Sequence, residues 1–228
     1  MPASKTAAAH APANGVPAEP PADCPLCPRL VAFREENAQT YPDYFNGAVA
    51  SFGDENAALL IVGLAPGLHG ANKTARPFTG DYAGDLLYAT IAKFGFSRGA
   101  YKADPQDGLK LRGAMITNAV RCVPPQNKPV GAEIRACRPF LKSRIDALPK
   151  LRAILCLGRI AHDSTLAALG IRAKDAPFGH GAAHDIDDNP ARLFDSYHCS
   201  RYNTNTRRLT TEMFEDVFAD IRRYIDNT

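Results

Sequence analysis

The sequence predicts an α/β fold, a three-layer sandwich with a central four-stranded, mainly parallel sheet. Short apolar runs alternate with helical segments, and strands separated by helices form parallel sheets that are covered on both faces. The chain has 228 residues, of which 45% are hydrophobic and 22% charged, as expected for a globular protein. No apolar run approaches the roughly 18 residues that a membrane span needs, which excludes a transmembrane protein.

Four segments are expected to form the sheet. Residues 58–64 (ALLIVGL) and 113–120 (GAMITNAV) are continuous apolar runs, typical of strands buried on both faces. Residues 153–158 (AILCLG) form a third run, and 192–198 (RLFDSYH) a weaker fourth. Ligands bind beyond the carboxyl ends of such strands, so we expect the functional residues in the segments that follow them.

Helical patterns occupy the remaining regular segments. The expected helices cover residues 28–39, 84–95, 131–147, 159–169 and 210–225. The last has the clearest apolar stripe, formed by Met213, Phe214, Val217, Phe218, Ile221 and Ile225. Gly95 is expected to close the second helix, and Pro139 to kink or restart the third.

The first 22 residues (MPASKTAAAHAPANGVPAEPPA) differ from the rest in composition. They are rich in Ala and Pro and lack the basic start and apolar stretch of a signal peptide. Such a composition buries little apolar surface, so we expect a disordered tail over 1–22 and a single domain over 23–228. Without an export signal the expected compartment is the reducing cytoplasm, where structural disulfides are rare.

The six cysteines therefore include candidate metal ligands. Cys24 and Cys27 form a C-x2-C pair, and 14 residues separate Cys122 from Cys137. Four thiolates can hold a zinc ion or an iron–sulfur cluster, and the spacing does not distinguish between these groups. Cys156 lies within an apolar run and is expected to be a core residue.

A glycine-rich segment follows the first expected strand. Residues 63–85 (GLAPGLHGANKTARPFTGDYAGD) stand between a strand and a helix, where backbone amides can face an anion. The segment has neither the G-K-[ST] of a Walker loop nor the spacing of a G-x-G-x-x-G fingerprint. Long ordered loops are uncommon unless they serve a site, so we expect this one to be functional.

Three motifs together resemble a known family. The glycine-rich segment, TNAVRCVPP (117–125) and SYHCSRYNT (196–204) are similar to those of family 5 uracil-DNA glycosylases, the iron–sulfur type often called UDGb. The resemblance runs from Cys24 to about Leu209, with the motifs in the family's order. It implies a uracil-DNA glycosylase-like fold, and it implies that Cys24, Cys27, Cys122 and Cys137 bind a 4Fe–4S cluster.

The resemblance also implies site roles. Asp81 matches the acid that positions water, Asn118 the polar residue that contacts the base, and His198 the histidine of the last motif. Phe78 matches the aromatic residue that stacks on the flipped base. The other residues matched to the substrate pocket are Gly63, Ala65, Pro66, Gly67 and His69. Residues 64–67 offer no side-chain base, as is typical of family 5, and GLAPG replaces the family's usual GLAPA.

Each of these residues also has an ordinary structural interpretation. Phe78 would be a core residue, Asp81 an N-cap and His198 a structural histidine. Asn118 would be a strand-end residue, and His69 is equally a loop hydrogen-bonder or a pocket wall. The functional interpretation depends on their joint occurrence in the three motifs.

The chemistry agrees with these residue types. Breaking an N-glycosidic bond leaves negative charge on the base, so donors such as His198 and the backbone amides of 63–69 stabilise the transition state. The target base must leave the duplex, and an aromatic ring such as Phe78 can hold it. DNA phosphates need cationic partners, for which the candidates are Lys73, Arg76, Arg121, Arg201 and Arg207.

The resemblance implies a monofunctional DNA repair glycosylase that excises uracil and leaves an abasic site. The family's range extends to hypoxanthine, xanthine and ethenocytosine. The elongated motif of the covalent iron–sulfur relatives is not evident, and no lysine is placed for Schiff-base chemistry. One lesion needs one subunit, so a monomer is expected. Two rival classes are a non-catalytic iron–sulfur DNA-binding module and an iron–sulfur electron carrier; the aromatic loop and His198 argue against the carrier.

Overall fold

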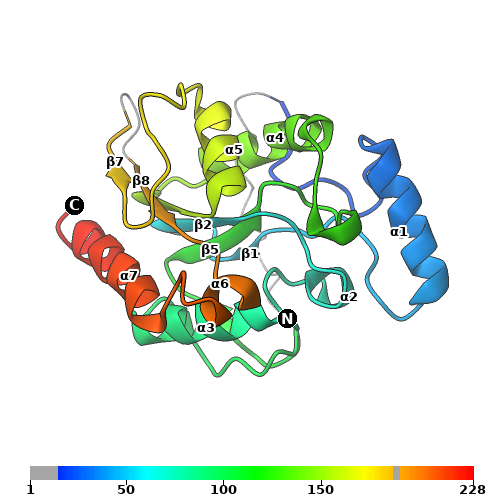
Figure 1. The fold of residues 1–228 in the computed structure, drawn as a ribbon, viewed down its shortest axis with the longest axis horizontal. Helices are drawn as coiled ribbons and strands as arrows, with labels where there is room; N and C mark the ends of the chain where they lie inside the picture. Colours follow the sequence, from blue (N-terminus) through cyan, green and yellow to red (C-terminus); the bar gives the residue numbers. More distant parts are fainter. Residues whose placement is uncertain (1–14, 187–190) are drawn as a thin grey trace, which may run out of the picture.

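A central sheet between two layers of helices forms the protein in the computed structural model, which describes residues 15–186 and 191–228 (Figure 1). The sheet order is β1-β5-β2-β6-β8-β7, and its four inner strands are parallel. These are β5 (Ala114–Asn118), β2 (Leu59–Gly63), β6 (Ala153–Leu157) and β8 (Arg192–Ser196). The predicted fold class and its four strands are confirmed.

Short strands that the sequence analysis did not predict extend the sheet. The antiparallel strands β1 (Phe52–Gly53) and β7 (Ala183–His184) lie at its two edges. A separate pair consists of β3 (Ser97–Arg98) and β4 (Lys110–Leu111). Each contains two residues, too few to produce a periodic pattern in the sequence.

The five predicted helices are present within one or two residues. They are α1 (Pro28–Thr40), α3 (Tyr82–Lys93), α4 (Gly131–Asp146), α5 (Arg159–Leu169) and α7 (Thr211–Asp226). Shorter elements are α2 (Ala71–Thr74), α6 (Arg201–Asn205) and the 3-10 turn Pro125–Asn127. Pro139 was expected to kink or restart the helix; a restart is wrong, since α4 continues through Pro139. Pro139 and Arg135 are both exposed, so the carbonyl that loses its partner can bind water.

Side chains of the parallel strands alternate between the two faces. On one face Leu59, Ile61 and Leu155 pack against α3 and α7. On the other face Leu60 and Val62 join residues of α4 and α5. None of the helices in the described residues is long and apolar enough to cross a membrane.

The expectation of a disordered tail differs from the structure where that segment is described. The Glu19 carboxylate accepts hydrogen bonds from Arg121 at 2.5 Å and from Arg144 at 2.7 Å, and Pro20 is buried. Remote arginines thus provide the binding energy that the local composition lacks. Residues 1–14 lie outside the described residues.

Candidate active site and cysteine pocket

The motif residues meet at the carboxyl edge of the sheet. Gly63 ends β2 and is paired with Asn118, which ends the adjacent β5. A Cβ atom on Gly63 would lie 2.4 Å from Asn118 Oδ1 and 2.7 Å from the Phe78 ring. Only glycine allows both side chains to approach this backbone so closely.

Phe78 lies at the centre of this site. Its ring faces that of His198, with the centroids 5.8 Å apart and the planes inclined by 27°. Its φ angle is +54°, a left-handed conformation that costs a bulky residue about 1–3 kcal/mol. The structure therefore brings Phe78, Asn118 and His198 together, as the motifs predicted.

Asn118 carries a polar atom that has no partner. The residue is only 3% exposed, and its Oδ1 accepts no hydrogen bond within the protein. A buried amide oxygen without a partner is costly, and a ligand that donates to it would remove that cost. The N3–H of uracil is such a donor.

His198 occupies the segment after β8. Its backbone oxygen accepts a hydrogen bond from Asn203 Nδ2 at 2.8 Å. Burial lowers the pKa of His198 to about 4, so the imidazole is neutral at physiological pH. A neutral imidazole can still donate one N–H to a base oxygen.

His198 also borders a pocket whose other lining residues the sequence analysis missed. Arg159 stacks on Phe178 at 5.2 Å, and Arg208 lies 4.6 Å from the centroid of Tyr197. Arg159 comes soon after the buried strand β6, and Arg208 follows Arg207, a predicted phosphate-binding residue. These positions are the only features of the sequence that could have indicated the two arginines.

One of the two predicted interpretations of Asp81, the N-cap, is observed. As N-cap of α3, its Oδ1 accepts a hydrogen bond from Gly84 N at 3.1 Å. Its Oδ2 lies against the glycine-rich loop, 2.6 Å from where a Cβ atom of Gly70 would be and 3.4 Å from that of Gly67. Burial raises the pKa of Asp81.

The remaining pocket residues have different surroundings. His69 is exposed, and its Nδ1 lies 3.1 Å from the hydroxyl of Tyr44, which fits a loop hydrogen-bonder. Pro66 is buried, and Ala65 is half-buried beside the cysteine pocket.

Three of the five predicted phosphate-binding cations are exposed. Lys73 lies 5.4 Å from the centroid of Tyr44 and Arg201 5.1 Å from that of Tyr82, while Arg207 is exposed in the same region as Arg201. These three side chains are available for DNA phosphates.

Arg76 and Arg121 require a correction. Arg76 is 5% exposed and donates two hydrogen bonds of 2.8 Å to the carboxylate of Asp107. Arg121 is 1% exposed and donates to Glu19. Both charges are buried and neutralised inside the protein, so neither side chain is available to a phosphate.

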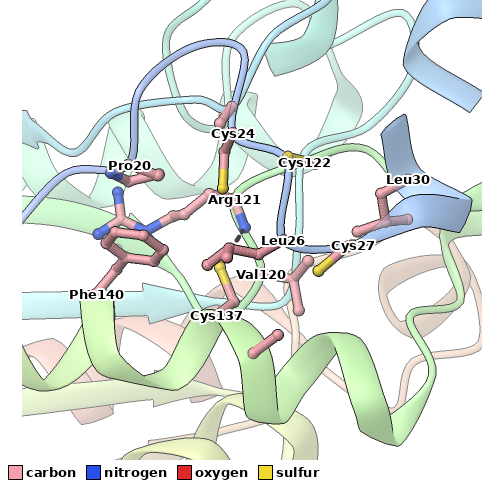
Figure 2. A pocket seen from close by; sticks show the side chains of 12 residues that line it. Pro20, Cys24, Leu26, Cys27, Leu30, Val120, Arg121, Cys122, Cys137 and Phe140 are labelled. Atoms are coloured by element: carbon pink, nitrogen blue, oxygen red, sulfur yellow. Dashed lines mark hydrogen bonds between the residues drawn. The ribbon is translucent and has the colours of Figure 1, made fainter. Parts of the chain in front are cut away.

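The four candidate ligand cysteines line one pocket. Figure 2 shows the sulfur atoms of Cys24, Cys27 and Cys137 turned toward its interior, and Cys122 on the loop beside it. All four are free thiols. Burial, followed by the repulsion of neighbouring thiols, raises the pKa of Cys27 to about 11 and that of Cys122 to about 12.

Among the residues that the structure describes, no three Cys, His, Asp or Glu side chains are spaced to hold one metal ion. Cys156 lies within β6 and is fully buried in the core, as predicted.

Comparisons with known proteins agree with the resemblance. The model of the family "Uracil DNA glycosylase superfamily" matches residues 50–222. The type-5 uracil-DNA glycosylase of Thermus thermophilus is 45% identical, with 88% of this chain and 93% of the relative covered. The type-5 enzymes of Mycobacterium leprae (40%; 88% and 90% covered) and Pyrobaculum aerophilum (37%; 86% and 86%) are also similar.

A type-4 uracil-DNA glycosylase of Pyrobaculum aerophilum is 35% identical over a shorter match, 58% of this chain and 59% of the relative. The type-5 relatives match at comparable or higher identity across most of the chain. The chain therefore belongs to the uracil DNA glycosylase superfamily, and within it to the type-5 family.

Proposed function

We propose that the protein is a monofunctional uracil-DNA glycosylase that hydrolyses the N-glycosidic bond of uracil in DNA and leaves an abasic site. The observation that carries this proposal is the unpartnered Oδ1 of Asn118, buried beside Phe78 and His198. A neutral base edge such as that of uracil, with an N–H donor beside a carbonyl acceptor, can donate a hydrogen bond to this oxygen. The pyrimidine ring can also stack on the ring of Phe78. Family membership supplies independent support.

In this mechanism the base leaves the duplex and enters the site edge first. His198 donates an N–H to a uracil oxygen, where negative charge grows as the sugar bond breaks. Asp81 orients the attacking water and offsets the positive charge on the sugar. Its carboxylate is held by the start of α3 and faces the loop Gly67–Gly70, beside the base site.

We infer a substrate range that includes hypoxanthine, xanthine and ethenocytosine. Residues 64–67 carry no polar side chain to reject other bases. The amide of Asn118 can present either an oxygen or an NH2 group to a base edge. Measuring excision rates for all four lesions in matched oligonucleotides tests this range, and activity on uracil alone would contradict it.

A uracil-containing oligonucleotide is the decisive substrate. Incubation with the purified protein, followed by alkali, should cleave the strand at the uracil position. An intact strand with a protein that still binds DNA would favour the alternative, a non-catalytic DNA-binding module. His198→Gln is the control for contaminating glycosylases, because it should bind DNA yet lose about 100- to 1,000-fold in rate.

We further propose that Cys24, Cys27, Cys122 and Cys137 hold a 4Fe–4S cluster. The cluster would join α4, the loop after β5 and the segment before α1 through four iron–thiolate bonds. Two hydrogen-bond donors adjoin the thiols: the backbone amide of Arg121 donates to Cys137 Sγ at 3.3 Å, and the guanidinium Nη1 of Arg34 lies 4.0 Å from Cys122 Sγ. Such donors stabilise the negative charge of a thiolate-bound cluster.

Two cysteine variants test the cluster without an activity assay. Cys122→Ser should lose the brown colour, most of the bound iron and soluble yield. Cys156→Ser is the matched control, because this buried cysteine lies outside the pocket and should keep the iron. A stable, fully coloured Cys122→Ser protein would contradict the ligand assignment. We also infer a monomer, since each lesion occupies a single site. We infer a cytoplasmic location as well.

A further inference from the structure

A buried ion pair joins Arg76 of the glycine-rich loop to Asp107. Arg76 donates to both carboxylate oxygens of Asp107 at 2.8 Å, and the side chains are 5% and 0% exposed. The Asp107 oxygens also accept hydrogen bonds from the backbone amides of Lys102 and Leu109, at 3.0 and 2.9 Å. Two backbone donors thus fix the carboxylate independently of the two hydrogen bonds that it accepts from Arg76.

Buried ion pairs rarely add stability compared with apolar residues of similar volume, and one attested use is to impose one arrangement on the chain. The arrangement at stake here is that of Phe78, two residues after Arg76. Its left-handed backbone (φ +54°) is unfavourable for an aromatic residue, so its surroundings must maintain it. Ala75, on the other side of Arg76, also has a positive φ of 60°.

Contacts lead from the ion pair to Phe78 on both sides. Arg76 Nε donates to Thr79 Oγ1 at 2.7 Å, which brackets residues 77 and 78 between two fixed points. The guanidinium also lies 5.6 and 5.7 Å from the ring centroids of Tyr88 and Tyr101, which stack on each other at 4.4 Å.

The two tyrosines continue the connection to the backbone. The Tyr88 hydroxyl donates to Pro77 O at 2.7 Å, and the Tyr101 hydroxyl donates to Phe78 O at 3.2 Å. The carbonyls on either side of the Phe78 amide and α-carbon are therefore both held. This leaves the Phe78 ring directed toward Gly63 and His198.

We propose that Arg76, Asp107 and Tyr101 are positioning residues that hold Phe78 in the conformation that stacks on the flipped base. This inference rests on the proposed function, because it concerns the same site. It assigns Arg76 a role inside the loop in place of a contact with DNA. It also includes Asp107 and Tyr101, which lie outside all three sequence motifs.

A double-mutant cycle tests the connection. Tyr101→Phe removes the hydrogen bond to Phe78 O and a longer one from Gly80 N. It should slow single-turnover excision of uracil about 5-fold, the effect of losing about 1 kcal/mol from the bond that holds Phe78. Asp107→Asn should slow it by up to about 100-fold through misplacement of the ring. Affinity for uracil-free duplex DNA should not change in either variant, because neither residue contacts phosphate in this assignment.

The decisive comparison is made in a Phe78→Ala background. If the residues act through Phe78, neither substitution should reduce the rate further once the ring is gone. Tyr44→Phe is the matched control: it removes a hydroxyl that binds the same loop at His69, and its effect should persist unchanged in the Phe78→Ala background.

The outcomes are distinct. If Tyr101→Phe and Asp107→Asn reduce the excision rate by the same factor with and without the Phe78 ring, the inference is overturned and the proposed function remains intact. A wild-type protein that releases no uracil would refute the proposed function, and this inference with it. If Asp107→Asn does not fold, Tyr101→Phe completes the cycle, since it removes a single oxygen atom.

Discussion

Acidification is expected to destabilise the protein through His198. Burial lowers the pKa of this histidine from 6.5 to about 4 in the folded state, whereas the unfolded chain keeps the ordinary value. Between pH 6.5 and pH 4 the unfolded state binds more protons than the folded state. The contribution of His198 to the free energy of unfolding is therefore fully present above pH 6.5 and is lost as the pH falls toward 4. The shift of about 2.5 units corresponds to about 2 kcal/mol lost at pH 5 and about 3 kcal/mol at pH 4.

The measurement compares wild type with His198→Gln. Urea unfolding at pH 7.5, 6 and 5 gives the free energy of unfolding of each protein, and the difference between the two isolates His198. The contributions of other titrating groups cancel in this difference. They include that of His162, whose pKa is lowered by burial but raised overall by its hydrogen bond to Asp195. Wild type should lose about 2 kcal/mol more than the variant between pH 7.5 and 5.

Identical pH dependence in the two proteins would refute this reasoning. It would mean that His198 is solvated well enough to be protonated at ordinary pH. The imidazole would then be a cation near pH 6, and the neutral-donor mechanism would lose its basis.

Three further perturbations probe other parts of the molecule. Asp81→Asn keeps an oxygen that can cap α3, so thermal stability should persist while single-turnover excision slows about 100-fold; an unchanged rate would remove Asp81 from the mechanism. Glu19→Gln leaves the buried guanidinium of Arg121 without its counter-charge and should lower the free energy of unfolding in urea by roughly 3 kcal/mol. A decrease below about 1 kcal/mol would indicate that the segment around Glu19 is only loosely held. Lys73→Ala and Arg201→Ala should each reduce the slope of log affinity for DNA against log salt by about 1, and an unaltered slope would exclude the phosphate contact.

The sheet could be predicted because its information is local. Residues 58–64 and 153–158 are short runs without a polar side chain, a pattern typical of strands buried on both faces. The edge strands β1 and β7 could not be predicted, since a pair of residues carries no periodicity. They exist because neighbouring strands β5 and β8 offer free hydrogen-bonding edges.

The roles of charged residues were harder to predict than those of apolar ones. Arg76 and Arg121 stand in or beside the motifs, which made them candidates for phosphate binding. Their partners Asp107 and Glu19 are 31 and 102 residues away, and no local pattern indicates such pairing. Glu19 was moreover part of a segment whose composition indicated disorder. A buried charge is identified by its counter-charge, and only the folded chain brings the two together.

The short path between Asn118 and Cys122 has a consequence for experiments on this protein. Three residues separate them, and two of these are hydrogen-bonded to the glycine-rich loop, Ala119 N to Gly63 O at 2.9 Å and Val120 N to Leu64 O at 3.0 Å. Because the connecting segment is so short, we expect a change at the Cys122 thiol to shift the Asn118 amide as well. Loss of catalysis after cysteine damage would report a distorted recognition pocket, and by itself would say nothing about electron transfer.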